Sequence, residues 1–438
     1  DGVAGTPADD LIILAGDGGD GAVLTITGNI GDVVALTTLN INAGAGNGDI
    51  AFTVPQIGGG GSPGVTGAVN LGNTGSGDIT FSGSGANAFD IGGKLTVTSN
   101  GGADAFKFTG TDTVITADGG IEFVSGAGSD DGITLSDEKD LTLTSTDTDI
   151  TVTSVVGVAG NNGEDFTINI VQSSGGGTAT VGAISTDIND VVITGQTIKL
   201  GGNITTESDP NGGSADAASI DLNGAVVVDA STVTLTTGNG TIDFSSTVDS
   251  TANADNNLTV VSGTGTAVFN GAIGTGTNGE IGILTVNSAG TGNITISDIG
   301  DANNAGVSGA TAIGNTTTNT LELKGTTYNT NAATYTAKEG ETIDLTGGST
   351  TTFTTSSDAV TFGTATVEMG NGSHLVIDTS TGGGALISLV AGVMGTSSEN
   401  ITLTAGTGAV TLGTIGTGTE IADVCLLYTS DAADDPTC

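Results

Sequence analysis

Leu141-Thr142-Leu143-Thr144 and, a few residues later, Ile150-Thr151-Val152-Thr153 carry the pattern that decides the fold. In both runs an apolar residue alternates with a threonine. Alternation with a period of two residues predicts a half-buried β-strand, with one face inward and one face outward. Threonine suits the outward face because it is β-branched and tolerates contact with water.

The same phrase recurs along the chain, and its copies are separated by turns. The further copies are Ile79-Thr80-Phe81-Ser82, Leu95-Thr96-Val97-Thr98, Phe166-Thr167-Ile168-Asn169, Leu258-Thr259-Val260-Val261, Leu284-Thr285-Val286-Asn287, Ile294-Thr295-Ile296-Ser297 and Ile401-Thr402-Leu403-Thr404. Gly, Asn and Asp cluster between the copies, and these residues accept the positive φ angles of turns. Residues that favour helices are scarce, and no segment carries apolar residues at helical spacing over three turns. The sequence therefore predicts an all-β protein.

The spacing of the copies selects among all-β folds. The gaps are irregular, so the fixed repeat of propeller blades is not supported. We expect a right-handed parallel β-solenoid, whose coils contribute two or three short strands and whose loops leave the coil without breaking the stack. Coils of about 20–22 residues would give a rod of roughly 20 coils. Tandem β-sandwiches are the alternative fold, although 3% aromatic and 12% charged residues are low for such domains.

Composition excludes several classes of function. Six Lys+Arg against 48 Asp+Glu give a formal net charge of −42, and all six bases are lysines. Such a chain lacks the basic surface that binds nucleic acid, and anionic lipid would repel it. No run of about 18 apolar residues is present, so no membrane-spanning segment is predicted. A hydrophobic content of 36% and a mean hydropathy of +0.19 are too apolar for a disordered chain.

The C-terminal residues point to a different origin from the rest of the chain. The run Cys425-Leu426-Leu427-Tyr428-Thr429-Ser430-Asp431-Ala432-Ala433-Asp434-Asp435 resembles the in-frame translation of a transposase sequencing adaptor. We therefore expect residues 1–424 to be one continuous solenoid array with both natural ends missing, as in a metagenomic fragment. Residues 425–438 are expected to be a non-native tail. Both cysteines, Cys425 and Cys438, lie in this tail, so no disulfide is expected between them.

The strand phrases between Gly- and Asn-rich turns resemble the passenger regions of a known class of bacterial exoprotein. Residues 257–298 and 326–380 are the most similar to the β-helical passengers of filamentous-haemagglutinin-like exoproteins and autotransporter adhesins. The resemblance implies export, display as a rod at the bacterial cell surface, and attachment to a surface, a glycan or a cell receptor. A self-associating extracellular matrix or S-layer-like scaffold is the alternative function. No site residue carries over from the resemblance.

No set of residues is a strong candidate for catalysis, so the chain is expected not to be an enzyme. His374 is the only histidine, it cannot form a zinc site alone, and it is predicted to lie in a solvated loop. Asp130 and Asp131 are adjacent and would point to opposite faces of a strand, whereas a glycosidase needs two carboxylates about 5–10 Å apart on one site. Gly92-Gly93-Lys94 precedes Leu95 and is no phosphate-binding Walker motif. A β-helical polysaccharide-active enzyme is the third alternative.

No cofactor is expected, and calcium is the only metal worth considering. Oxygen-rich turns bind calcium, and three acidic segments have that character. These segments are Asp17-Gly18-Gly19-Asp20-Gly21, Asp147-Thr148-Asp149 and Asp187-Ile188-Asn189-Asp190. The first differs from the calcium-binding nonapeptide of RTX repeats, because Val23 stands where that motif has Asp. We expect at most weak calcium binding, in the roughly millimolar range, and assign no catalytic, cofactor-binding or metal-binding residue.

Overall fold

The computed structural model describes most of the chain. The described residues are all except 1–8, 15–22, 32, 44–47, 54–55, 59–62, 74–76, 83–86, 100–104, 126–131, 159, 161–162, 186, 209–217, 288, 371, 417–420 and 429–438. Over these residues the chain has no helix, is 56% strand, and forms a β-solenoid of about 14 turns. It divides into two compact units, Asp1–Gly224 and Ala225–Cys438, with the boundary inside β20 (Ile220–Val228).

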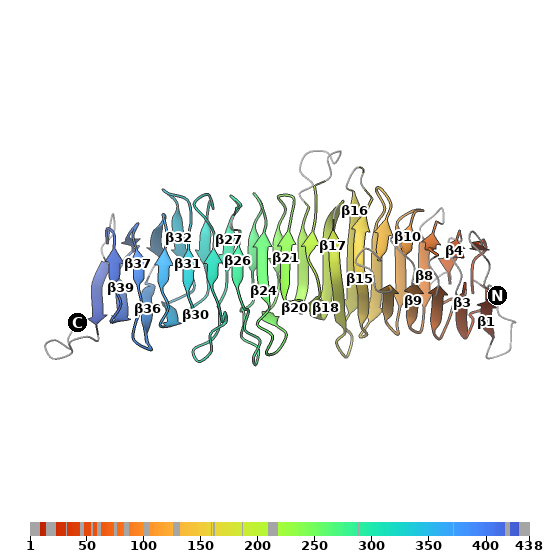
Figure 1. Ribbon diagram of the computed structural model, residues 1–438, viewed down its shortest axis with the longest axis horizontal. Helices are drawn as coiled ribbons and strands as arrows, with labels where there is room; N and C mark the ends of the chain where they lie inside the picture. The colour runs from red at the N-terminus through yellow and green to blue at the C-terminus, as the bar shows by residue number, and fades with distance from the viewer. Residues whose placement is uncertain are drawn as a thin grey trace. The chain divides into compact units, whose positions relative to one another are not determined.

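Unit 1 consists of three ladders of parallel strands, which we name 1A, 1B and 1C. Figure 1 shows its strands lying side by side, with loops projecting from their ends. Ladder 1A contains β1 (Asp10–Leu14), β3 (Thr38–Asn42), β6 (Val69–Asn73), β9 (Leu95–Ser99), β12 (Ile121–Ser125), β15 (Ile150–Gly157), β17 (Thr178–Ser185) and the second half of β18 (Ile188–Leu200). Ladder 1B contains β2 (Val23–Ile26), β4 (Asp49–Phe52), β7 (Ile79–Phe81), β10 (Phe106–Phe108), β13 (Ile133–Leu135), the later parts of β15 and β17, and β19 (Ile204–Thr205). Ladder 1C contains β5 (Gln56–Ile57), β8 (Asn87–Ile91), β11 (Thr113–Ala117), β14 (Leu141–Thr146), β16 (Glu164–Val171) and the first half of β18.

Unit 2 likewise consists of three parallel ladders, named 2A, 2B and 2C. Ladder 2A contains β21 (Thr232–Thr236), β24 (Asn257–Val261), β26 (Leu284–Val286), β28 (Thr311–Ile313), β31 (Ala333–Tyr335), β34 (Val360–Phe362), β37 (Ile387–Leu389) and β40 (Val410–Leu412). Ladder 2B contains β22 (Ile242–Phe244), β25 (Ala267–Phe269), β27 (Ile294–Ile296), β29 (Leu321–Leu323), β32 (Thr342–Leu345), β35 (Thr366–Met369) and β38 (Val393–Met394). Ladder 2C contains β23 (Val248–Ser250), β30 (Thr327–Thr330), β33 (Thr350–Ser356), β36 (His374–Thr381), β39 (Glu399–Gly406) and β41 (Ile421–Tyr428).

The parallel β-solenoid is confirmed, and the tandem sandwich alternative is wrong. Every strand pair resolved among the described residues is parallel, whereas sandwiches are built from antiparallel strands. All nine apolar-Thr-apolar phrases form strands in which the apolar residues are buried and the threonine faces outward, as in Leu141-Thr142-Leu143. The alternation places one side of most strands in the apolar interior of their unit, whereas β1, β2 and β40 have no buried residue.

The coils are longer and fewer than the sequence predicts. Hydrogen bonds between adjacent coils join residues 30 positions apart at Asn40 and Asn70, and 22 positions apart at Asp229 and Thr251. The expected 20–22 residues is therefore only the lower end of the range, and about 14 turns replace roughly 20. The difference arises because each coil carries three strands together with loops that project from the stack.

Aromatic rings stack on one another inside each unit, because in-register pairing places like positions above each other. In unit 1 the ring of Phe81 lies 5.3 Å from that of Phe52 and 4.7 Å from that of Phe108, in nearly parallel planes. In unit 2 the ring of Phe244 lies 4.4 Å from that of Phe269. All of these side chains are buried.

Glycine is required where one coil turns closely over the next. A Cβ atom added to Gly182 would lie 1.8 Å from the carbonyl oxygen of Thr153, and one added to Gly274 would lie 1.9 Å from that of Gly306. Gly274 also has a φ of +68°, a conformation that other residues rarely adopt. Close contact between coils therefore explains part of the high glycine content.

The beginning of the expected tail is part of a strand. Residues 425–428 belong to β41, which pairs with β39 through Thr402↔Cys425 and Leu403↔Leu426. Cys425 is disulfide-bonded, so the expectation of no disulfide is wrong. Residues 429–438 lie outside the described residues. The adaptor origin and the single array over 1–424 stay predictions.

Replacing Phe81 by alanine tests the stacked interior of unit 1. Phe81 is 2% exposed and contacts rings on both neighbouring coils. Its removal leaves a cavity, and we expect a loss of about 3–5 kcal/mol in unfolding free energy, measured by urea titration with far-UV circular dichroism. The control Val114→Ala, at a side chain that is 44% exposed, should cost under about 0.5 kcal/mol. Equal effects of the two substitutions would contradict the assigned interior.

Candidate functional site

The central positions of the strands of ladder 2A form a column in which seven of eight residues bear a hydroxyl group; Ala312 is the exception, and Ser388 is buried, at 6% exposed. Each member stands at the outward central position of its strand and is paired in register with the next. The column, which we name the hydroxyl face, consists of Thr234, Thr259, Thr285, Ala312, Thr334, Thr361, Ser388 and Thr411. Six of these eight residues are threonines, although the coils that carry them differ in length.

The columns on either side of the hydroxyl face are uncharged. The residues two positions before it are mostly aliphatic, and those two positions after it are small or uncharged. The preceding column is Thr232, Asn257, Ile283, Ala310, Ala332, Ala359, Leu386 and Ala409, and the following column is Thr236, Val261, Asn287, Gly314, Thr336, Gly363, Val390 and Gly413. Ile283, Leu386 and Val390 are 46%, 39% and 53% exposed. A chain with a net charge of −42 thus keeps three adjacent columns of ladder 2A free of charge.

Three hydroxyl groups of this face, those of Thr285, Thr334 and Thr361, are available to a ligand. Within the described part of the chain, the hydroxyls of Thr285, Thr334 and Thr361 make no hydrogen bond. Two threonines on other surfaces of unit 2, Thr346 and Thr364, are used internally, whereas Thr352, Thr402 and Thr404 on ladder 2C also make no side-chain hydrogen bond among the described residues. The Thr346 hydroxyl donates to Glu322 at 2.9 Å, and the Thr364 hydroxyl donates to the carbonyl of Ala337 at 2.6 Å. Each hydroxyl that lacks a partner retains one donor and two acceptor positions.

Ladder 2B of the same unit is acidic at the corresponding positions. Glu322, Asp344 and Glu368 stack in register on consecutive coils. Glu322 accepts hydrogen bonds from the hydroxyls of Thr295 and Thr346, and Oδ1 of Asp344 is buried without a partner. A hollow of about 230 Å³ lies beside this column. The charged groups of unit 2 therefore concentrate on surfaces other than the hydroxyl face.

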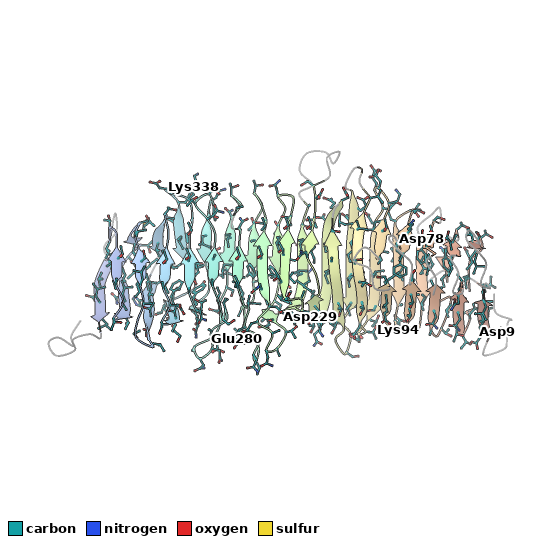
Figure 2. The ribbon with its side chains drawn as sticks, viewed as in Figure 1. Asp9, Asp78, Lys94, Asp229, Glu280 and Lys338 are labelled. Atoms are coloured by element: carbon teal, nitrogen blue, oxygen red, sulfur yellow. The ribbon has the colours of Figure 1, made fainter. Side chains whose placement is uncertain are left out.

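Unit 1 contains a polar groove of about 410 Å³ on ladder 1A. It is lined by Lys94, Gly119, Ile121, Glu122, Asp147, Thr148, Asp149 and Thr151. The ammonium group of Lys94 pairs with the carboxylate of Glu122. Figure 2 shows Lys94 at one edge of unit 1, with Asp78 at the opposite edge in that view. The groove brings together Lys94 and the segment Asp147-Thr148-Asp149, which the sequence analysis considered separately for phosphate and calcium binding.

The carboxylates of this groove hold the neighbouring coil in place. Asp147 accepts hydrogen bonds from the backbone N–H groups of Ser173 at 2.7 Å and Ser174 at 2.9 Å, and from both serine hydroxyls. Asp149 accepts one from the N–H of Thr178 at 2.7 Å. The hydrogen bonds from Ser173, first from its hydroxyl and then from its N–H, hold the pKa of Asp147 well below its usual range. Both aspartates thus have a structural role.

Ladder 1C carries a column of aspartates that cap one another. Oδ1 of Asp112 accepts from the N–H of Asp140 at 3.4 Å, and the pattern repeats from Asp140 to Asp165 and from Asp165 to Asp190, each at 3.1 Å. Asp190 ends the column by accepting from the N–H of Ser219 at 2.6 Å. Burial, and to a smaller extent the charge of Asp112, raise the pKa of Asp140. Asp190 belongs to the third calcium candidate and serves here as a coil-to-coil cap.

Glu164 is a buried acid without a hydrogen-bond partner. Its side chain is 0% exposed, and neither carboxylate oxygen has a donor within bonding geometry. Burial, followed by the nearby carboxylates of Asp137 and Asp187, raises the pKa of Glu164 to about 7. The Glu164 carboxyl group is therefore protonated over most of the acidic pH range, because burial and the neighbouring carboxylates oppose its ionisation.

Glu399 is the opposite case in unit 2. It is also 0% exposed, but it accepts hydrogen bonds from the N–H groups of Ser397 and Gly372 and from the hydroxyls of Thr396 and Ser397. Burial alone would raise its pKa, and these hydrogen bonds outweigh burial and lower the pKa of Glu399 to about 2. Since the pKa is depressed, this carboxylate stabilises the fold above its ordinary titration range and loses that effect only in strong acid.

His374 is a strand residue and not the solvated loop residue predicted from the sequence. It begins β36, pairs with Thr350 and is half-buried. Its Nδ1 accepts a hydrogen bond from the N–H of Asn400 at 3.1 Å, and its own N–H donates to the carbonyl of Ser349. The prediction failed because the turn before it ends at Ser373, where pairing with the preceding coil begins.

Several sequence candidates lie outside the described residues, namely Asp17-Gly18-Gly19-Asp20-Gly21 and Asp130-Asp131. Within the described part of the chain, no group of three or more His, Cys, Asp or Glu side chains is arranged to hold a metal ion. The described residues also include no helix long and apolar enough to cross a bilayer.

Sequence reasoning missed Thr334 and Thr361 of the hydroxyl face. Both stand in apolar-Thr-apolar triplets, Ala333-Thr334-Tyr335 and Val360-Thr361-Phe362, which a broader definition of the phrase would have found. Their membership in one column depends on strand register, which unequal coil lengths hide. The salt bridge between Lys94 and Glu122 was missed for the same reason.

Comparison with known proteins identifies no relative. No protein-family model, no curated protein and no solved structure matches the chain. The arrangement of side chains on the solenoid is therefore the basis for any inference about function.

Replacing Glu164 by glutamine tests the buried acid. Because the folded-state pKa lies above the ordinary value of 4.5, the contribution of Glu164 to stability is fully present below about pH 4.5 and is lost as the pH rises through about 7. Glutamine cannot ionise, so we expect Glu164→Gln to remove about 1–3 kcal/mol of the decline between about pH 5 and pH 8, measured by urea titration at each pH.

The exposed Glu138, on a neighbouring turn, provides the control for this experiment. The substitution Glu138→Gln removes the same charge from solvent and should leave the pH dependence of the wild type unchanged. Parallel stability curves for the wild type and Glu164→Gln would contradict the assignment of a buried, unpartnered carboxyl group.

Proposed function

We propose that this chain is a segment of a secreted or cell-surface adhesin from a bacterium, in which the β-solenoid displays repeated weak contacts to an external surface. The observation that carries the proposal is the hydroxyl face, where the same uncharged position recurs on consecutive coils and bears a hydroxyl on all of them except at Ala312. The resemblance of the strand phrases to filamentous-haemagglutinin-like and autotransporter passengers supports extracellular display.

Multivalency is the physical basis of the proposed attachment. A single threonine contributes little binding energy, and no aromatic side chain stands in the outward columns of ladder 2A. Several identical contacts on one rigid scaffold act together, because the first contact raises the effective concentration for the next. Stacked coils suit this role, since their stability adds over neighbouring coils.

The proposal assigns no catalytic activity to the chain. In the groove of unit 1, Glu122 is paired with Lys94, and Asp147 and Asp149 accept backbone N–H groups of the next coil. An acid–base pair for glycoside cleavage would need carboxylates that are free to exchange protons with a substrate. These contacts support a structural and adhesive role over a polysaccharide-active enzyme.

Fluorescent beads coated with the full chain test the adhesin proposal. We expect their retention under flow to exceed that of albumin-coated beads several-fold on at least one of three surfaces, namely epithelial monolayers, a bacterial biofilm and uncoated glass. The triple variant Thr285→Asp/Thr334→Asp/Thr361→Asp should lose this retention, because it places three charges on the hydroxyl face.

The matched control carries the same three added charges on ladder 2C. Thr352, Thr402 and Thr404 face outward there, are half-buried as Thr285 is, and make no side-chain hydrogen bond among the described residues. Their triple Asp variant should bind like the wild type. Equal loss in both variants, or no retention on any surface, would refute adhesion through the hydroxyl face. Concentration-dependent association in sedimentation velocity would instead favour the self-associating scaffold.

A further inference from the structure

We propose that the hydroxyl face binds a neutral, linear polysaccharide laid along the stacking direction of ladder 2A. This inference rests on the proposed function and specifies the chemical class of the ligand. The site consists of the hydroxyl column and of the aliphatic column beside it, which includes Ile283 and Leu386.

Charge selects a neutral ligand. The chain carries a formal charge of −42, so nucleic acids, acidic polysaccharides and further copies of the chain approach against repulsion. A cationic ligand would be drawn to ladder 2B, where Glu322, Asp344 and Glu368 stack on consecutive coils. Ladder 2A offers neither attraction to a cation nor an added barrier to an uncharged molecule.

The chemistry of the two columns fits a polyhydroxylated chain. The hydroxyls of Thr285, Thr334 and Thr361 have no partner among the described residues, so each can donate to and accept from a sugar hydroxyl. The aliphatic side chains beside them can cover the apolar C–H surface of a sugar ring. A wholly apolar ligand would leave the hydroxyls without partners, and that loss is costly.

Periodicity favours a polymer over a small molecule. Neighbouring parallel strands lie about 4.8 Å apart, so the eight strands of ladder 2A span roughly 34 Å. Seven of them carry a hydroxyl at the central position, Ala312 is the exception, and Ser388 is only 6% exposed. A linear homopolysaccharide also repeats its hydroxyl groups at fixed intervals, so one chain can meet several coils together. A disaccharide meets only one or two coils and gains little from the repeat.

Affinity gel electrophoresis of the full chain provides the test. The polymers are hydroxyethylcellulose, amylose and galactomannan, which are neutral, and carboxymethylcellulose, which has the cellulose backbone with added negative charge. We expect at least one neutral polymer to retard the protein and carboxymethylcellulose not to retard it. Oligosaccharides of the retarding polymer should compete more strongly as they lengthen.

Variants without hydroxyl groups assign the site. Thr285→Val/Thr334→Val/Thr361→Val keeps the side-chain shape and removes three hydroxyls, and we expect retardation constants at least about tenfold weaker. The control Thr352→Val/Thr402→Val/Thr404→Val makes the same chemical change on ladder 2C and should bind like the wild type. Far-UV circular dichroism of each variant checks that the fold is retained.

The outcomes separate this inference from the adhesin proposal. No retardation by any of the three neutral polymers, or equal retardation of the hydroxyl-face variant and the wild type, overturns the polysaccharide assignment. If chain-coated beads still adhere through the hydroxyl face in that case, the ligand class is wrong and the adhesin proposal stands. Stronger retardation by carboxymethylcellulose than by hydroxyethylcellulose would also overturn the assignment, because the argument from charge would then fail.

Discussion

Parallel, in-register hydrogen bonding between coils is the constraint on which the rest of the structure depends. Each backbone group bonds to the coil above or below, so a residue type chosen for one coil stands directly over its counterpart in the next. The interior accepts this because apolar groups attract like groups, as Phe52, Phe81 and Phe108 do. The coil corners accept it where glycine allows close approach, as at Gly182.

In-register stacking of coils is unfavourable for charged side chains, because it places like charges directly above one another. Stacked carboxylates lie near one another and repel, and on ladder 1C the structure offsets the repulsion by giving the aspartates backbone donors. Asp140, Asp165 and Asp190 all follow this arrangement, and Asp147 uses the N–H groups of a turn. Glu164 lacks such a donor and has its pKa raised, whereas Glu399 has several and has its pKa lowered. Burial dominates at Glu164, whereas hydrogen bonds outweigh burial at Glu399.

Much of the fold could be predicted from the sequence, because a period of two residues is a local property. Leu141-Thr142-Leu143 needs no knowledge of the rest of the chain to be assigned as a strand with Thr142 outward. Register is not local. Coil length varies between Asn40–Asn70 and Asp229–Thr251, so neither the number of coils nor the column that a threonine joins can be counted from spacing. The prediction of a loop position for His374 was wrong for a related reason. The residue belongs to a strand because it pairs with Thr350 on the preceding coil.

The uncharged surface of ladder 2A is difficult to explain by solubility or stability alone. Stacking brings like charges close together, yet ladders 1C and 2B retain carboxylate columns, and hydrogen bonds to Asp140 on ladder 1C and to Glu322 on ladder 2B offset part of the repulsion. Ladder 2A has the same backbone geometry and could hold such columns in the same way. Thr285, Thr334 and Thr361 also keep hydroxyls that no neighbour within the described residues uses, whereas Thr346 and Thr364 donate to their own fold. A surface that is spared charge and keeps its hydroxyls without partners has the properties of a surface that meets another molecule.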